Sequence, residues 1–95
     1  MIVIRSADEL AILRKANQIL ARILHELRED MKVGSSTEAL DRKAERLILA
    51  AGGRPAFKGY RGYPKTICTS INEQVVHGIP SPEVLLNEGD ILSID

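Results

Sequence analysis

The sequence predicts an α+β fold in which two helices pack on an antiparallel sheet. The residues up to 51 carry two runs of apolar side chains at helical spacing, each preceded by residues that cap helices. After the glycine pair at 52–53, short β-branched runs separated by turn signals replace that spacing. Because both helices precede all of the expected strands, we expect one face of the helix pair to cover the sheet.

The first expected helix follows a short β-prone segment at residues 1–4. Ser6 and Glu9 fit a capping box, in which the serine hydroxyl accepts from the third amide of the helix and the glutamate reaches back. His25 lies within the helix, and we interpret it as a surface or boundary histidine. An apolar stripe extends the helix to about Asp30 and consists of Leu10, Ile12, Leu13, Ala16, Ile19, Leu20, Ile23, Leu24 and Leu27.

The start of the second expected helix has three candidate caps. Ser35 with Glu38 would form a second capping box, whereas Ser36 or Thr37 could be the cap instead. The apolar face of the helix is formed by Leu40, Ala44, Leu47, Ile48 and Ala51. The glycine pair at 52–53 ends the helix, because glycine accepts the left-handed conformation that closes one.

Three short strands are expected in the second half of the chain. Residues 65–70 and 73–77 contain β-branched side chains, and Asn72 lies between them where a turn is expected. Residues 91–95, ILSID, alternate apolar and polar side chains and predict a third strand. Since the chain stops inside this strand without a turn signal, we expect it to be the front part of a longer protein.

The composition argues against several classes of partner. Thirteen basic and thirteen acidic residues cancel, so no net field favours nucleic acid or acidic lipid. No apolar stretch is long enough to span a bilayer, and the N-terminus lacks the pattern of a signal peptide. The single cysteine, Cys68, cannot form an internal disulfide. We therefore expect a cytoplasmic protein with no specific nucleic acid and no membrane as partner.

Several residues of the second half are candidates for a site. The three aromatic residues, Phe57, Tyr60 and Tyr63, fall within seven residues, whereas a core built for packing alone would spread them along the chain. His77 precedes a Gly-Ile-Pro break, and its spacing alone leaves three roles open: packing, metal binding and proton transfer. Asp95, considered alone, is either a solvated acid or a ligand.

The stretch GYRGYPKTICTSINEQVVHGIP, followed by LNEGDILSID, resembles the type I methionine aminopeptidases of metallopeptidase family M24. That family has a G-Y-x-G-[FY]-P motif, an S-[IV]-N-E-x-[VI] strand pair, H-G-I-P and a G-D-[IV]-x-x-[IV]-D strand in the same order. The segment KVGSSTEALD matches a looser family pattern, with Val33 in place of the usual proline. The resemblance covers all 95 residues, and its specific part runs from 59 to 95.

The resemblance implies a pita-bread fold, in which two similar halves face each other and this chain, residues 1–95, is the N-terminal half of the catalytic domain. The family site holds two divalent metals, Mn, Co, Fe or Zn, bound by two aspartates, one histidine and two glutamates. Asp95 corresponds to the first ligand aspartate, and the other ligands lie downstream in the family. We therefore expect this chain alone to bind no metal stably and to have no aminopeptidase activity.

The resemblance also implies roles for the remaining candidates. His77 corresponds to the family histidine that hydrogen-bonds the substrate and handles a proton. Tyr60 and Tyr63 correspond to residues that line the pocket for the methionine side chain. Cys68 corresponds to a position near that pocket and is otherwise an inert buried thiol. Phe57 belongs either to the pocket wall or to a small aromatic core cluster.

The implied function is that of a dinuclear metal-dependent aminopeptidase that removes the initiator methionine, with nascent protein N-termini and the ribosome as partners. Asn72 resembles a residue beside a monovalent-cation site, although a turn asparagine explains it equally well. A second interpretation is a non-catalytic half-fold that self-associates through its open sheet edge. A third is a pita-bread relative that binds without catalysis.

Overall fold

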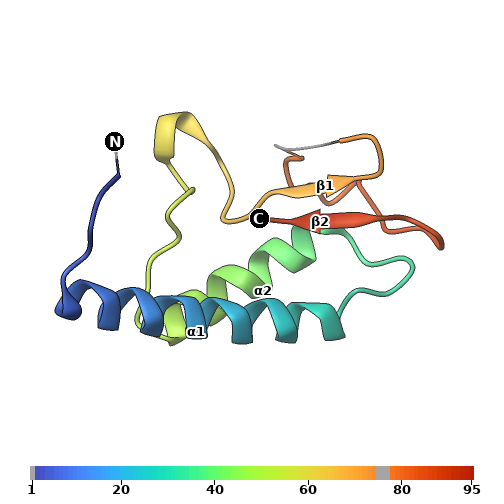
Figure 1. Cartoon of the computed structure of the whole chain (residues 1–95). Helices are drawn as coiled ribbons and strands as arrows, with labels where there is room; N and C mark the ends of the chain where they lie inside the picture. Colours follow the sequence, from blue (N-terminus) through green and yellow to red (C-terminus); the bar gives the residue numbers. More distant parts are fainter. Residues whose placement is uncertain (1, 75–77) are drawn as a thin grey trace.

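The computed structural model describes residues 2–74 and 78–95, and it shows two helices on one side of a small sheet (Figure 1). The expected α+β class, two helices packed on an antiparallel sheet, is therefore confirmed. In chain order the elements are α1 (Ala7–Glu29), α2 (Thr37–Ala50), the 3-10 turn η1 (Tyr60–Gly62), β1 (Thr69–Ile71) and β2 (Leu92–Ile94).

Helix α1 begins as the capping residues predict. The Ser6 Oγ accepts from the Glu9 N–H at 3.2 Å, and the Ser6 N–H donates to the Glu9 Oε1 at 3.0 Å. The β-prone start does not form a strand in its described part, since residues 2–6 have no regular structure and Ile2 and Ile4 are exposed. An isolated β-prone segment needs a neighbouring strand, and the described chain has none beside it.

Helix α2 is capped by Ser36, one of the three candidates. Its Oγ accepts from the Ala39 N–H at 3.1 Å, which satisfies an amide that has no partner inside the helix. The helix ends as expected before the glycine pair, with Gly52 in the left-handed region at a φ of 84°.

The sheet is antiparallel and consists of β1 and β2, with Ser70 opposite Ser93. The strand expected at 65–70 is displaced toward Ile71, and the one expected at 91–95 is shorter by a residue at each end. Of the strand expected at 73–77, Glu73 lies in a turn, Gln74 has no regular structure, and the remaining three residues lie outside the described residues.

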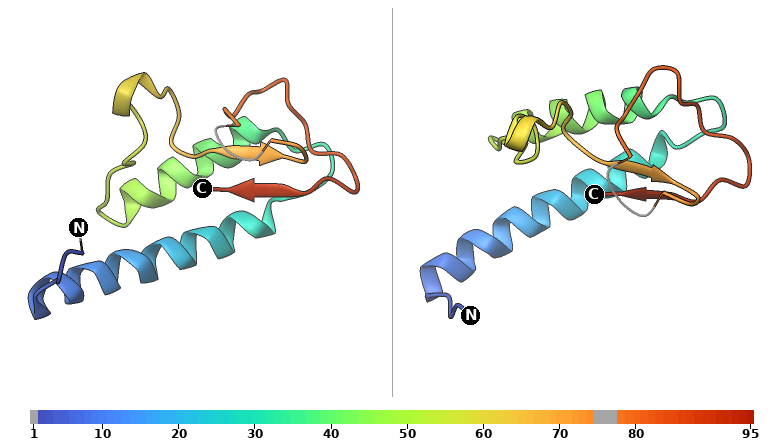
Figure 2. Two further views of the ribbon diagram at one scale, coloured as in Figure 1. Left: turned by 45° about the horizontal axis from the view of Figure 1, so that its top comes forward. Right: turned by 90° about the horizontal axis from the view of Figure 1, so that it is seen from above.

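The core lies where the two helices meet the sheet. Its buried apolar residues are Ile23, Leu27, Leu40, Ala44, Ile67 and Leu86, and Ile71, Leu92 and Ile94 pack against it from the sheet. The N-terminal half of α1 extends past the sheet (Figure 2). The expected stripe is therefore only partly buried: Ile23 and Leu27 are covered, whereas Leu10, Ile12, Leu13, Leu20 and Leu24 are exposed. Within the described residues, neither helix has the length and hydropathy to cross a bilayer.

Candidate functional site

The face of the sheet opposite the helices carries small and polar side chains. Alternation along the strands places Ile71, Leu92 and Ile94 toward the core. Cys68 and Asp95 form a backbone pair next to the strand ends, with N–H to O distances of 2.8 and 3.1 Å in the two directions. These two hydrogen bonds fix the backbone of Asp95 to that of Cys68, so the two side chains lie side by side across the strands.

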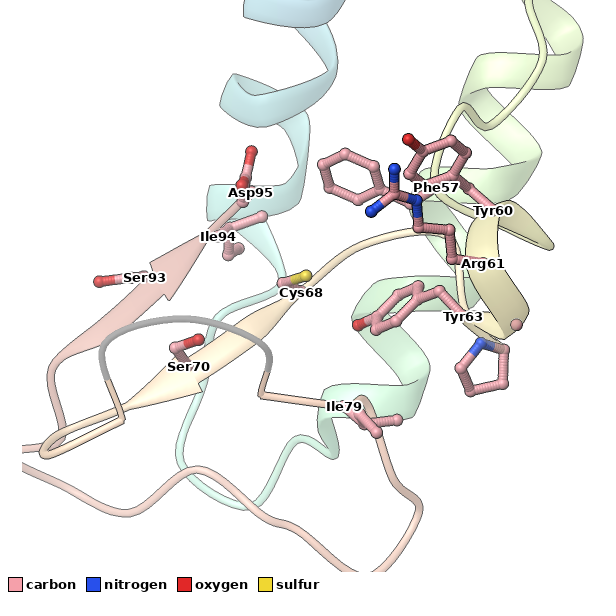
Figure 3. Close-up of a pocket in the computed structure, with 12 residues that line it drawn as sticks. Phe57, Tyr60, Arg61, Tyr63, Cys68, Ser70, Ile79, Ser93, Ile94 and Asp95 are labelled. Carbon is pink, nitrogen blue, oxygen red and sulfur yellow. The ribbon is translucent and has the colours of Figure 1, made fainter.

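A cavity of about 730 Å³ lies over this face (Figure 3). The sheet side carries Cys68 and Asp95, and the aromatic residues lie across from them (Figure 3). The residues that line the cavity are Phe57, Tyr60, Arg61, Gly62, Tyr63, Pro64, Cys68, Ser70, Ile79, Ser93, Ile94 and Asp95. The described structure thus brings Phe57, Tyr60, Tyr63, Cys68 and Asp95, all candidates from the sequence, into one cavity.

The aromatic wall is shaped by a tight turn in the left-handed region. Gly59, Arg61 and Gly62 have φ values of 84°, 50° and 80°, and such values are easy for glycine and rare for arginine. The Arg61 guanidinium lies 5.2 Å from the centre of the Tyr60 ring, a cation–π contact. Sequence reasoning missed Arg61, although its place between the two tyrosines of the Gly-Tyr motif was a signal.

Phe57 belongs to both of the groups that the sequence left open. Its ring contacts that of Tyr63 edge to face, with centroids 6.3 Å apart and planes 85° apart, and it also lines the cavity. The aromatic cluster and the cavity wall are therefore one structure.

Tyr63 connects the wall to the scaffold. Its hydroxyl donates to the Ile67 carbonyl at 2.8 Å. Burial raises the pKa of the Tyr63 phenol well above its ordinary value of 10.0, and the nearby Cys68 thiol and Asp41 carboxylate raise that pKa further. The phenol therefore stays protonated and remains a hydrogen-bond donor at neutral pH.

Asp41 is a buried acid that sequence reasoning did not consider. Its side chain on α2 is 4% exposed, and its Oδ1 accepts from the N–H groups of Thr66 and Ile67 at 2.8 and 2.9 Å. A signal was available, because an aspartate next to Leu40 on the apolar face of a predicted helix must find donors when it is buried.

His77 lies outside the described residues, whereas its neighbour Gly78 is well defined by its contacts. The Thr69 N–H donates to the Gly78 carbonyl at 2.7 Å, and the Gly78 N–H donates to the Ser70 Oγ at 3.1 Å. A Cβ at position 78 would lie 2.0 Å from the Thr69 carbonyl oxygen. Only glycine permits this approach to β1, at the edge of the strand whose Ser70 lines the cavity.

The donors of the described cavity fit part of a divalent metal site. Asp95 is exposed at the end of β2 and presents hard carboxylate oxygens to the cavity, the type of donor that divalent metals such as Mn accept. Among residues 2–74 and 78–95, no three His, Cys, Asp or Glu side chains come together as a metal centre would require. Asp95 is therefore suited to be one ligand of a site that needs further donors.

The chain belongs to metallopeptidase family M24, whose profile matches residues 11–95. It is 48% identical over all of its 95 residues to methionine aminopeptidase 1 of Bacillus subtilis and 47% identical to the methionine aminopeptidase of Clostridium acetobutylicum. The chain spans 38% of the length of each of these curated relatives.

Solved structures agree with the sequence relatives. The methionine aminopeptidases of Rickettsia prowazekii and Thermotoga maritima superpose with TM-scores of 0.95 at 36% identity, covering 100% and 99% of this chain and 38% of each of theirs. The resemblance to type I methionine aminopeptidases and the expectation of one half of a pita-bread fold are both confirmed.

Proposed function

We propose that residues 1–95 form the N-terminal half of the catalytic domain of a methionine aminopeptidase, which removes the initiator methionine from nascent proteins. One observation carries the proposal: Tyr60, Tyr63, Cys68 and Asp95 line a single cavity. The relatives that match the whole chain support the same activity, because they are named methionine aminopeptidases.

In this proposal the cavity receives the side chain of the substrate methionine. The rings of Tyr60, Tyr63 and Phe57 form one wall, and the Cys68 thiol lies on the other (Figure 3). A thioether against aromatic edges contributes about 0.3–1.5 kcal/mol, which favours methionine over a straight alkyl chain of similar length. Arg61 at the same wall adds a positive charge at the cavity.

His77 is proposed to hydrogen-bond the substrate and to handle a proton during hydrolysis, since an imidazole titrates near neutral pH. The support comes from its described neighbour, Gly78, which is bonded to β1 beside the cavity-lining Ser70.

Asp95 is proposed as one ligand of a site for two divalent metals, which would be Mn, Co, Fe or Zn. When bound, such metals supply an activated water and polarise the scissile carbonyl. The backbone pair with Cys68 holds Asp95 on a rigid element, as a ligand requires. One carboxylate cannot hold two metals, so we propose that the other ligands belong to the region that completes the length of the relatives.

The proposed substrates are the N-termini of nascent proteins, encountered at the ribosome in the cytoplasm. The balanced charge and the single buried cysteine support this compartment.

A chimera tests the proposed activity. This chain replaces the matching segment of the Bacillus subtilis relative, and release of methionine from a Met-Ala-Ser peptide is measured with added Mn or Co. We expect turnover, and we expect Asp95→Ala and His77→Ala each to lower it by about 100-fold or more. Asp8→Ala, an exposed acid in the first turn of α1, is the matched control and should leave turnover unchanged. A folded chimera without turnover would refute the proposal.

The 95-residue chain by itself is expected to release no methionine from the same peptide under the same conditions. Measurable turnover that disappears in Asp95→Ala would show that the chain supplies a complete site.

We also propose that the isolated chain self-associates. Because Cys68 and Asp95 exchange both backbone bonds, the N–H and C=O groups of Ile94 point away from β1 toward the open edge. The exposed leucines of α1 add an apolar surface. Light scattering should give a mass above the 10.5 kDa of one chain, and a clean monomer at high concentration would contradict this.

A further inference from the structure

The two backbone bonds that Asp41 accepts join helix α2 to the segment that leads into β1. The carboxylate lies 25 positions before the nearer of its two donors, so this contact exists only in the folded chain. Both hydrogen bonds are charge-assisted, because two consecutive N–H groups donate to one buried carboxylate. Loss of the carboxylate would leave these buried N–H groups without partners.

Both backbone polar groups of Ile67 are hydrogen-bonded to side chains. Its N–H donates to Asp41, and its C=O accepts from the Tyr63 hydroxyl. The next residue, Cys68, is in turn bonded through its backbone to Asp95. A continuous series of contacts therefore leads from Asp41 to the aromatic wall on one side and to the sheet side of the cavity on the other.

We propose that Asp41 is a positioning residue, which fixes the segment 66–68 so that Tyr63 and Cys68 keep the spacing that a methionine side chain requires. The inference rests on the proposed function, because it assigns the cavity to the substrate methionine. Asp41 itself does not line the cavity, so its effect reaches the substrate through Tyr63 and Cys68.

The composition of the chain makes this positioning measurable. Cys68 is the single cysteine and is 8% exposed, so the rate at which a neutral thiol reagent modifies the chain reports the opening of this segment alone. The chain has no tryptophan, so its near-ultraviolet circular dichroism reports the packing of Tyr60 and Tyr63.

The variants are Asp41→Ala, Asp41→Asn and, as control, Ala39→Gly, at an exposed position two residues before Asp41 on α2. The control lowers stability through helix propensity and leaves both the Asp41 carboxylate and the core packing in place. We expect Asp41→Ala to raise the Cys68 modification rate roughly tenfold or more and to reduce the tyrosine signal. Asp41→Asn should lie between, because an amide oxygen still accepts but carries no charge. Ala39→Gly should leave the rate near that of the chain without substitutions.

Equal rates for Asp41→Asn and Ala39→Gly would overturn the proposal, and this comparison holds even where Asp41→Ala fails to fold. In the active chimera, Asp41→Asn should raise the KM for Met-Ala-Ser several-fold and change kcat less, since the wall of the binding cavity is affected. A fall in kcat with KM unchanged would also overturn it. A chimera without turnover would refute the proposed function alone, because the thiol and tyrosine measurements judge the positioning role independently.

Discussion

Tyr63 shows how one side chain serves both the scaffold and the site. Its ring lines the cavity and meets the edge of Phe57, while its hydroxyl donates to the Ile67 carbonyl. The position of the ring is thereby tied to the position of the backbone. A residue held in this way keeps its rotamer without a ligand, which lowers the entropy cost of binding.

The titration of Tyr63 predicts an alkaline loss of stability. Burial raises the pKa of this phenol, so the folded chain holds the proton more tightly than the unfolded chain, whose phenol titrates near 10.0. The stabilising contribution of the Tyr63 phenol to the free energy of unfolding is therefore fully present below pH 10.0 and declines as the pH rises above that value. Tyr63→Phe should flatten this decline while costing about 1 kcal/mol at neutral pH.

Urea unfolding of both proteins at neutral and alkaline pH checks this expectation. An equally steep decline in Tyr63→Phe would show that other groups cause the alkaline loss.

At the scale of elements, the site depends on what lies at each edge of β1. One edge pairs with β2, and the other receives Gly78, whose carbonyl accepts from the Thr69 N–H. The backbone approach at Gly78 is too close for any β-carbon. The glycine of the His-Gly-Ile-Pro motif is therefore a structural requirement of the strand that carries the cavity face.

Gly78→Ala should disrupt this edge of β1. The new Cβ would lie 2.0 Å from the Thr69 carbonyl oxygen, a backbone atom that cannot move without breaking the strand contacts. We expect a loss of about 1–3 kcal/mol or more in the free energy of unfolding, as for other severe steric conflicts in a packed region. The matched control is Gly53→Ala, whose Cβ would lie 3.3 Å from the Ile48 Cγ2 and 3.4 Å from the Ile48 carbonyl oxygen, and which should therefore change stability less than Gly78→Ala. Thermal unfolding followed by circular dichroism measures both, and equal effects would contradict the argument.

At the scale of the whole molecule, the core occupies one end. Ile23 and Leu27, in the second half of α1, belong to the core cluster, whereas the first half of α1 extends beyond the sheet (Figure 2). A chain of 95 residues buries a smaller share of its surface than a large domain does. Each fully buried side chain therefore carries a large part of the stability.

Leu27→Ala and Leu10→Ala form a test of this uneven core. Leu27 is 0% exposed and Leu10 is 51% exposed, although both lie on the same predicted apolar stripe. We expect Leu27→Ala to cost about 2–5 kcal/mol and Leu10→Ala about 0.5 kcal/mol or less. Urea unfolding gives both values, at concentrations where light scattering shows a monomer. A similar cost for the two substitutions in the monomer would contradict the uneven core.

The sequence by itself determined the elements whose signals are local. Capping at Ser6, helix spacing and the glycines after α2 act over a few residues, so they predicted both helices closely. The motif from Gly59 to Asp95 also identified the family and the candidate residues, because their order and spacing are specific. Even among these signals, the choice of Ser36 as the second cap was left open, since its neighbours cap helices equally well.

Only the tertiary structure decided which of these residues meet. Asp41 and Thr66 are 25 positions apart, and Cys68 meets Asp95 across the sheet, contacts that no local pattern contains. It also decided which half of α1 is buried, because helical spacing describes an apolar face and not the partner that covers it. The physical reason is common to both: burial and long-range hydrogen bonds depend on where the chain returns in space, and sequence periodicity records only the direction in which each side chain points.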